Sequence, residues 1–344
     1  YNYLGRLGDG TQTTLRLPKA TGLANVVQVA GSRGNFGVAL KADGTVWSYG
    51  QNNVGQLGDG TLTDRLAPVQ VAGLTNVVQV VAGYDFALAL KSDGSVWGWG
   101  SNSYGQLGDG TTSNRSTPVQ VRYLSGVKWI GLSGGNATAY AHKADGTVWS
   151  WGYARTWQPE LEGSLVGVTG IAALALGDSH VLVLRDDNTV WSYGSDSYGE
   201  LGDSSASSGG SQLRQVTALS GIAAVAANAN RSFALKYDGT LWAWGYNGNG
   251  ELGDGTTSSR AVPVQVPGLT SVVQVAAGVS HTLALTSDGT LWAWGTNSSG
   301  QLGDNETLTR VNAVVVHDGV NLGYFNATNT TATVGSGTRS EEHT

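Results

Sequence analysis

The feature that most constrains the fold is a phrase of eight residues, close to Asp-Gly-Thr-Val-Trp-Ser-Trp-Gly, that recurs six times along the chain. The first aspartate advances from residue 43 to residue 288 in five steps, which is a mean period of 49 residues. A fixed period of this length is typical of repeat architectures, in which each unit buries its apolar face against its neighbours. The six copies occupy residues 43–50, 93–100, 145–152, 187–194, 238–245 and 288–295.

A second phrase, close to Gln-Leu-Gly-Asp-Gly-Thr, follows most copies of the first. After residues 145–152 it is absent, and a stretch running from Tyr153 to Pro159 stands in its place. One further copy, at residues 6–11, has no front half before it. The chain therefore contains six full repeats and a partial seventh.

Each repeat has the pattern of four short strands, as the sixth one illustrates. An apolar run at 272–277 is followed by a second at 281–285, and the Asp288-Gly289 pair between this run and the next predicts a type I′ hairpin turn. Residues 290–294 then alternate with period two. Four strands in each repeat of about 50 residues, with no helical apolar period, predict an all-β fold, a β-propeller of four-stranded antiparallel blades.

Residues 272–302 resemble the regulator of chromosome condensation repeat through a Val-x-x-Val-Ala run, His-Thr-Leu-Ala-Leu, an Asp-Gly hairpin, Trp-x-Trp-Gly and Gln-Leu-Gly. The resemblance covers roughly residues 1–316 and implies a propeller of seven blades. This chain departs from that number, so we expect residues 12–20 to form a lone outer strand, paired with part of 313–334 if the ring closes. The expected organisation is a partial blade at 1–20, six propeller repeats at 21–316, a tail or partial closing blade at 317–338, and a non-native tail at 339–344.

Composition narrows the possible functions. The absence of cysteine excludes disulfide and thiol chemistry, and the net charge of −6 with a pI near 5.3 argues against a nucleic-acid partner. No apolar run is long enough to span a bilayer, so we expect no membrane insertion.

The repeated residues are expected to be scaffold. The ten repeat tryptophans should pack within or between blades, and the aspartate of each Leu-Gly-Asp phrase should cap its own loop. Calcium is the alternative role for these aspartates, but one carboxylate in about 50 residues is too few for its coordination. His180 and His281 lie two blades apart at equivalent positions, which indicates structural roles. We therefore expect no metal, no cofactor and no enzymatic activity.

The loops that vary between repeats are the candidate binding site. If the small-residue strand is innermost, its exit loop and the loop after Trp-x-Trp-Gly open on one face, opposite the Asp-Gly hairpins. Tyrosine, asparagine, aspartate and one tryptophan on rigidly held loops are typical of recognition surfaces, although an ordinary hydrated loop surface has the same composition. Asn52, Asn102 and Asn247 belong to the same loops. The candidate partner-binding residues are Arg33, Tyr84, Asp85, Asn136, Asp178, Asn230, Tyr104, Tyr153, Arg155, Trp157, Tyr198 and Tyr246.

These observations favour a non-enzymatic, extracytoplasmic interaction module, a bacterial and monomeric protein that is secreted or held at the cell surface. Its partner would be a protein or a glycan bound through the variable loops, and truncation of Trp157 should weaken that binding. The six lysines and the abundance of serine, threonine, asparagine and glycine suit such a location. The family resemblance implies two alternatives, a regulator similar to a guanine-nucleotide exchange factor and a secreted enzyme inhibitor.

Overall fold

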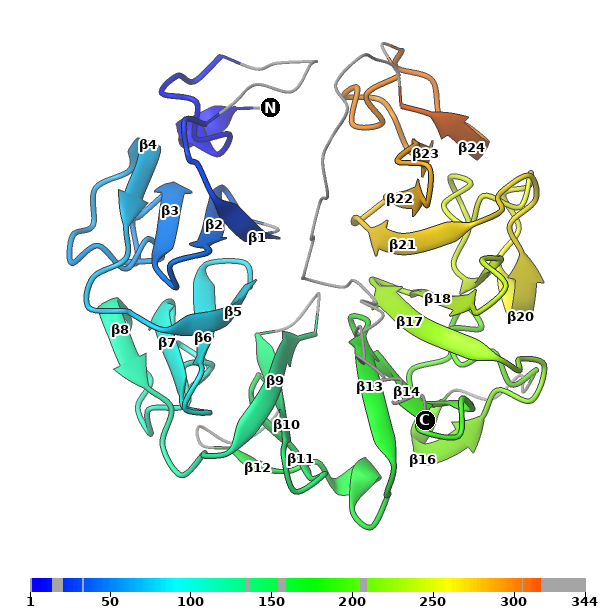
Figure 1. Cartoon of the computed structure of the whole chain (residues 1–344), viewed down its shortest axis with the longest axis horizontal. Helices are drawn as coiled ribbons and strands as arrows, with labels where there is room; N and C mark the ends of the chain where they lie inside the picture. The colour runs from blue at the N-terminus through cyan, green and yellow to red at the C-terminus, as the bar shows by residue number, and fades with distance from the viewer. Residues whose placement is uncertain are drawn as a thin grey trace, which may run out of the picture.

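The computed structural model describes residues 2–13, 21–32, 34–133, 137–153, 159–204, 209–304 and 306–316. Six four-stranded antiparallel sheets are arranged as blades around a central axis (Figure 1). The described residues contain no α-helix; they include two single 3-10 turns, η1 (Tyr3–Gly5) and η2 (Gly163–Leu165). The predicted all-β propeller with six full blades is confirmed.

The strands of each blade follow one another in sequence order from the centre of the ring outward. Blade 1 consists of β1 (Val26–Gly31), β2 (Phe36–Lys41), β3 (Val46–Gly50) and β4 (Arg65–Gln70). Blade 2 consists of β5 (Val77–Ala82), β6 (Phe86–Lys91), β7 (Val96–Gly100) and β8 (Arg115–Gln120). Blade 3 consists of β9 (Val127–Leu132), β10 (Thr138–Lys143), β11 (Val148–Gly152) and β12 (Glu160–Leu161). Blade 4 consists of β13 (Ile171–Leu176), β14 (His180–Arg185), β15 (Val190–Gly194) and β16 (Gly210–Gln215). Blade 5 consists of β17 (Ile222–Asn228), β18 (Arg231–Lys236), β19 (Leu241–Gly245) and β20 (Arg260–Gln265). Blade 6 consists of β21 (Val272–Ala277), β22 (His281–Thr286), β23 (Leu291–Gly295) and β24 (Arg310–Val315).

The Asp-Gly hairpins join the second and third strands of each blade, but their turn differs from the predicted type. In blade 5 the backbone N–H of Lys236 donates to the carbonyl of Thr240, and Gly239 has a φ of 78° while Asp238 does not enter the positive region. The carboxylate of Asp238 instead accepts hydrogen bonds from the backbone N–H and the hydroxyl of Thr240 at 2.9 and 2.6 Å. The predicted two-residue type I′ turn is therefore wrong, because the aspartate stabilises a longer turn that needs a positive φ only at its glycine.

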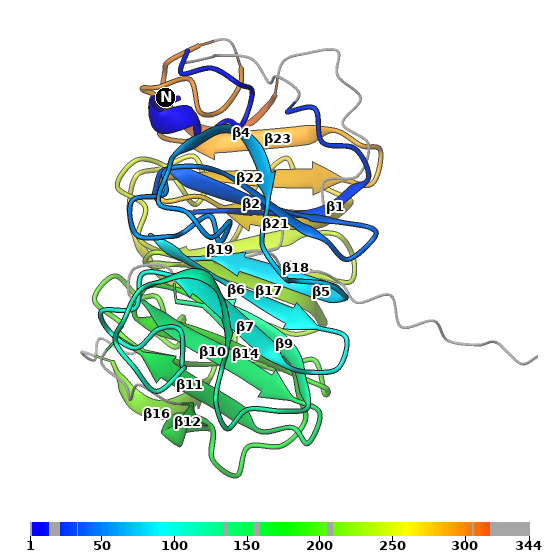
Figure 2. The same cartoon turned by 90° about the vertical axis from the view of Figure 1, so that its left-hand side faces the viewer.

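The strand order places the two kinds of loop on opposite faces of the ring. Phe36, at the start of β2, pairs with Gly50, at the end of β3, so the loops after β1 and after β3 emerge at the same end of the blade. Figure 2, from the side, shows the strands running from one face to the other. We call the face with the loops after the first and third strands of each blade the variable face, and the one with the Asp-Gly turns the hairpin face.

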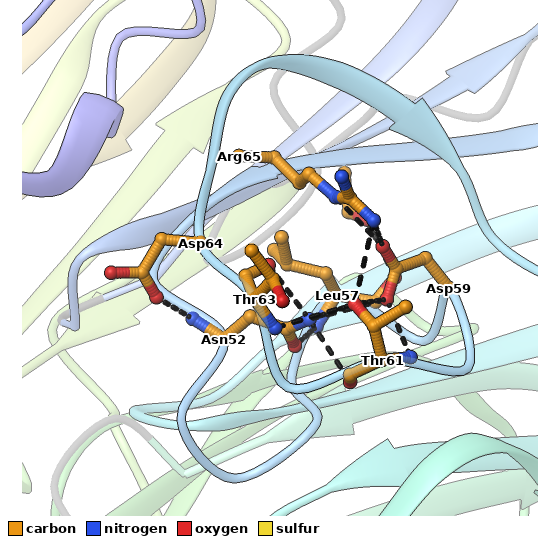
Figure 3. Close-up of polar contacts among 8 residues, drawn as sticks. Asn52, Leu57, Asp59, Thr61, Thr63, Asp64 and Arg65 are labelled. Atoms are coloured by element: carbon orange, nitrogen blue, oxygen red, sulfur yellow. Dashed lines mark hydrogen bonds and ion pairs between the residues drawn. The ribbon is translucent and has the colours of Figure 1, made fainter.

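A buried asparagine organises the long loop between the third and fourth strands. In blade 1, Asn52 donates through Nδ2 to Oδ1 of Asp59 and to the carbonyls of Thr61 and Thr63, and its Oδ1 accepts the N–H of Leu57 (Figure 3). The other oxygen of Asp59 accepts from Arg65 at 2.9 Å. We call this arrangement the clasp; it recurs around asparagines 2, 102, 247 and 297.

The clasp accounts for the aspartate of each Leu-Gly-Asp phrase. Burial alone would raise the pKa of Asp59, but hydrogen bonds from Thr61 and the guanidinium of Arg65 outweigh it and hold the pKa below its ordinary value. Both carboxylate oxygens thus have donors from the loop itself. The expected capping role is confirmed.

Each clasp also contacts the next blade, through the second tryptophan of the repeat. Trp99 of blade 2 donates its indole N–H to the carbonyl of Gln56 in blade 1 at 3.0 Å, and its side chain is fully buried. Trp151, Trp244 and Trp294 make the same bond to the preceding blade at 2.8–3.0 Å. These four tryptophans are therefore between-blade packing, as the sequence predicted.

Among the described residues, blade 6 and blade 1 do not pack against each other as the other neighbouring blades do. The inner strands of neighbouring blades pack together from β1 through to β21, but no comparable contact joins β21 or β22 to β1 or β2 among the described residues. The loop at residues 2–13 packs on β3 and β4 of blade 1, as the clasp of one blade packs on the next. This loop carries the Leu-Gly-Asp phrase of the partial seventh repeat. The pairing predicted for 12–20 with 313–334 lies mostly outside the described residues, and 313–315 belong to β24 instead.

We call the junction between blade 6 and blade 1 the seam. A glutamine that occupies the same position in three blades shows how the seam differs from the other junctions. Gln28 donates to the carbonyl of Val80 at 2.7 Å and accepts its N–H at 3.0 Å, and Gln79 makes the same two bonds to the next blade. In blade 6 the equivalent Gln274 has a buried Nε2 with no hydrogen-bond partner in the described chain. For Gln28 and Gln79 the next inner strand supplies both partners, whereas no described residue supplies one for the Nε2 of Gln274.

We expect the clasp to contribute strongly to stability. Replacing Asn102 with alanine should lower the free energy of unfolding by about 2–3 kcal/mol, because the N–H of Leu107 and the carbonyls of Thr111 and Ser113 lose their partner in a buried site. Denaturant unfolding measures this. Ser103→Ala, an exposed change in the same loop, is the control and should be nearly neutral. Equal losses in the two variants would contradict the clasp as a stabilising unit.

The seam should be the weakest part of the ring. Gln79→Leu should cost about 2 kcal/mol, since it leaves the backbone groups of Ile130 unpaired, whereas Gln274→Leu should be neutral or stabilising. Hydrogen exchange should be faster in β1 and β21 than in β13 and β17, because an edge blade lacks one neighbour. Equal effects of the two substitutions, with uniform protection around the ring, would indicate a closed structure instead.

Candidate functional site

The variable face carries the predicted binding residues that the structure describes. Tyr84, Tyr104 and Tyr198 are exposed at 67%, 52% and 44% of their surface. Asp85, Asp178, Asn230 and Tyr246 are partly buried, and Tyr153 is exposed. Four predicted residues lie outside the described residues: Arg33, Asn136, Arg155 and Trp157.

Two pairs of tyrosines bridge adjacent blades at equivalent positions. Tyr104 of blade 2 meets Tyr153 of blade 3 with ring centroids 4.9 Å apart and an interplanar angle of 82°. Tyr198 of blade 4 meets Tyr246 of blade 5 at 5.0 Å and 77°. Edge-to-face pairs of this kind stabilise by about 0.5–1.5 kcal/mol beyond the burial of area. The pairs hold these side chains in fixed positions while leaving ring surface open to solvent.

A scaffold residue fixes the backbone of one tyrosine in each pair. The side-chain oxygen of Gln106 accepts the backbone N–H of Tyr104 at 2.9 Å, and Glu200 does the same for Tyr198 at 2.8 Å. The carbonyls of these two residues accept the indole N–H of Trp151 and Trp244. Gln106 and Glu200 therefore each hold a surface tyrosine through the side chain and a tryptophan of the next blade through the backbone carbonyl.

Four of the predicted residues line one cavity near the axis of the ring, which we call the central cavity. It has a volume of about 740 Å³, and the loops of blade 2 contribute Tyr84, Asp85 and Tyr104 to its wall. Tyr153 enters from blade 3, and His281 with Val279 from blade 6. The structure therefore brings together residues from both the inner and the outer loops of the variable face.

The backbone around Asp85 is tightly constrained. Its carbonyl accepts the N–H of Ser101 at 2.8 Å, and a side chain on Gly100, where φ is +96°, would lie 2.5 Å from the same oxygen. Gly34 of blade 1 approaches the carbonyl of Tyr84 so closely that no side chain fits there. Burial raises the pKa of the Asp85 carboxyl above its ordinary value.

A second, smaller cavity of about 320 Å³ shares Tyr153 and Ser133 with the central cavity. Asp178 and His180 of blade 4 line it. The imidazole of His180 is buried, and its Nε2 lies 2.9 Å from the hydroxyl of Ser232 in blade 5. Because that hydroxyl donates to the carbonyl of Glu200, the ring nitrogen must be the donor toward it.

The structure corrects part of the sequence interpretation. Asn52, Asn102 and Asn247, which the sequence grouped with the recognition loops, are fully buried in the clasps. Asn230 lines neither of the two cavities.

Conversely, sequence reasoning missed His281 and Gln106 as lining residues, because both occupy positions that repeat as scaffold. Arg231 was also missed: it is buried and donates to the carbonyls of Gly278 and Val279, which ties the inner loops of blades 5 and 6 together.

The buried histidines make stability depend on pH. Burial lowers the pKa of His180 from 6.5 to about 4, so the unfolded chain takes up a proton first as the pH falls. Stability should therefore be lost between about pH 6.5 and pH 4, by about 3 kcal/mol for this residue. His142 and His281, with pKa values also near 4, add to the slope.

The check is denaturant unfolding of the wild type and of His180→Gln between pH 7 and pH 4. The variant should show a shallower decline, because one of the three titrating side chains is gone. The clasp aspartates, whose pKa values are lowered, should contribute only below about pH 4. Identical slopes in the two proteins would show that His180 is not held neutral.

Comparison with known proteins places the chain among proteins of similar repeats. Two family models, both described as the regulator of chromosome condensation (RCC1) repeat, match it. One matches residues 43–90, 93–141 and 238–285, and the other matches 26–56, 77–106, 171–200, 222–251 and 272–301.

Among curated proteins, mouse (Mus musculus) E3 ubiquitin-protein ligase HERC2 is 30% identical over 157 residues, which is 42% of this chain and 3% of that protein. The human probable E3 ubiquitin-protein ligase HERC6 is 39% identical over 97 residues, 28% of this chain and 9% of that protein. The chain thus spans less than a tenth of the length of these relatives.

Solved structures agree on the fold. Prp20p of Saccharomyces cerevisiae has a TM-score of 0.76 at 20% identity, covering 88% of this chain and 81% of its own. Human WBSCR16 has a TM-score of 0.74 at 23% identity, covering 85% and 82%. With the repeat matches distributed around the whole ring, the chain belongs to the regulator of chromosome condensation repeat family.

Proposed function

We propose that this propeller is a non-enzymatic module that binds a partner protein through its variable face. The observation that carries the proposal is the contrast between the two faces. Loops on the variable face differ from blade to blade and present tyrosines around the central cavity, whereas the hairpins opposite repeat the same turn. A loop that only reverses the chain can have the same sequence in every blade. Loops that recognise one partner must differ, because each of them meets a different part of that partner.

The arrangement of the tyrosines supports this role. Tyrosine supplies a large amphipathic contact surface at a low cost in conformational entropy, and it is enriched where binding energy concentrates. Tyr104 and Tyr198 are held by hydrogen bonds to their backbones and by contacts between rings, so little ordering is required on binding. The similar propeller Prp20p of Saccharomyces cerevisiae has binding properties toward Gsp1p and histones.

The remaining parts of the proposal rest on composition. We propose a monomer located outside the cytoplasm, because lysine is scarce, cysteine is absent and small polar residues are abundant. The net charge of −6 supports a partner other than nucleic acid. No helix among the described residues is long and apolar enough to cross a membrane.

A matched pair of tyrosines provides the test. Tyr84 on the variable face and Tyr237 on the hairpin face are both exposed at 67%. A photo-crosslinking amino acid, p-benzoylphenylalanine, placed at position 84 of the full chain should capture a partner from the proteins of the source organism. The same group at position 237 should capture none. Excess unlabelled protein should compete, and Tyr104→Ala should weaken capture by tenfold or more, since loss of a central aromatic costs about 2 kcal/mol.

The opposite pattern decides against the proposal. Capture from position 237 but not from position 84 would assign the hairpin face. Capture at 84 that Tyr104→Ala leaves unchanged would show that the tyrosines only pack between blades. A glycan partner would give no protein adduct at 84 and would instead appear as a Tyr104-dependent signal on a glycan array.

A further inference from the structure

The central cavity contains a carboxylate, that of Asp85, which no cation among the described residues neutralises. Asp85 is partly buried, and no hydrogen bond or ion pair reaches its carboxylate from the residues that the structure describes. None of the described residues that line the cavity is a lysine or an arginine. Among these described lining residues, His281 alone could carry a positive charge, and its burial lowers its pKa to about 4, so it is neutral at pH 7.

The aspartates of four clasps and of the blade 3 hairpin have a cation beside them, which Asp85 lacks among the described residues. On the outer side of the variable face, Asp109 pairs with Arg115 at 2.6 Å, and the same pair recurs in the clasps of blades 1, 5 and 6. On the hairpin face, Asp145 lies 3.1 Å from Lys143 and accepts from Thr147. A desolvated carboxylate without such partners raises the free energy of the unbound protein. Binding a cation would relieve that cost.

The tyrosines of the cavity suit the same kind of ligand. Tyr84, Tyr104 and Tyr153 line it together with Asp85. The face of an aromatic ring attracts a cation, and the planar guanidinium of arginine both stacks on such a ring and binds a carboxylate through two parallel hydrogen bonds. Lysine has a compact charge that satisfies the first interaction but not the planar geometry.

We propose that the central cavity binds a cationic side chain of the partner protein, an arginine in preference to a lysine. The inference rests on the proposed function, because it names the group that a partner docked on the variable face inserts. The carboxylate of Asp85 accepts the guanidinium, and the rings of Tyr84 and Tyr104 contact its planar surface. The partner segment is therefore basic where it meets the axis of the ring.

The cavity is held in shape before binding, which strengthens the proposal. The backbones of Tyr84 and Asp85 are fixed by the close approach of Gly34 and by the bond from Ser101, and Gln106 fixes that of Tyr104. Pre-organised groups lose less binding energy to ordering, so even a single cationic side chain gains measurable affinity.

Saturation-transfer difference NMR on the full chain tests the cavity directly, with n-butylguanidinium as the probe and the neutral n-butylurea as its matched analogue. The cation should bind and the urea should bind at least fivefold more weakly. Asp85→Asn should weaken the cation at least fivefold, whereas Asp238→Asn, the same change on the hairpin face, should have no effect. Tyr104→Leu should weaken binding and Tyr104→Phe should preserve it, since the phenylalanine keeps the aromatic face.

Three results would overturn the inference. Equal binding of the two probes, or binding that Asp85→Asn leaves unchanged, would show that the cavity has no preference for a cation. Binding that appears only after Arg33→Gln would show that a guanidinium of this chain, from the residue next to Gly34, already fills the site. Each of these leaves the proposed function standing if the crosslink at position 84 is still obtained, so the two failures are distinguishable.

Discussion

The hydrogen bond from a buried tryptophan to a carbonyl of the preceding blade is the interaction on which the ring depends. The blades are separate sheets, so no ladder of backbone hydrogen bonds joins one to the next. The indole N–H of Trp99 or Trp151 reaches a loop carbonyl of its neighbour, and the ring system fills the space against the glycine of that loop. A clasp that holds this loop in one conformation is then required, since the carbonyl must be presented at a fixed place.

Two blades differ at the position of the second tryptophan. Blade 1 and blade 4 have Tyr49 and Tyr193 there. Blade 4 follows the repeat that lacks the Leu-Gly-Asp phrase, whereas Tyr49 lies beside Gly8 of the clasp at residues 2–13. A tyrosine at this position therefore occurs both with and without a clasp before it.

The repeat predicted the six four-stranded antiparallel blades, because the same residues pack in the same way in every blade. The hairpin turn was predicted wrongly, since the Asp-Gly pair alone does not show that the threonine after it binds the aspartate carboxylate. At the candidate site, variation between loops predicted Tyr84, Asp85, Tyr104 and Tyr153 as binding residues; their role stays a prediction, and the structure places all four around one cavity. It could not separate the buried Asn102 from the exposed residues beside it, because both lie in a polar loop and only the fold shows which one turns inward.

Gln106 has a consequence for how such a surface can diversify. Its backbone carbonyl serves the neighbouring blade, and its side chain serves the amide of Tyr104 rather than the phenol ring. Gln106 thus contacts only the backbone of residue 104. The side chain at position 104 can change without disturbing either hydrogen bond of Gln106. Valine, tyrosine, asparagine and serine occupy this position in different blades above the same glutamine or glutamate. In a propeller built in this way, the side chain at each loop tip can change separately while the hydrogen bonds between the blades stay the same.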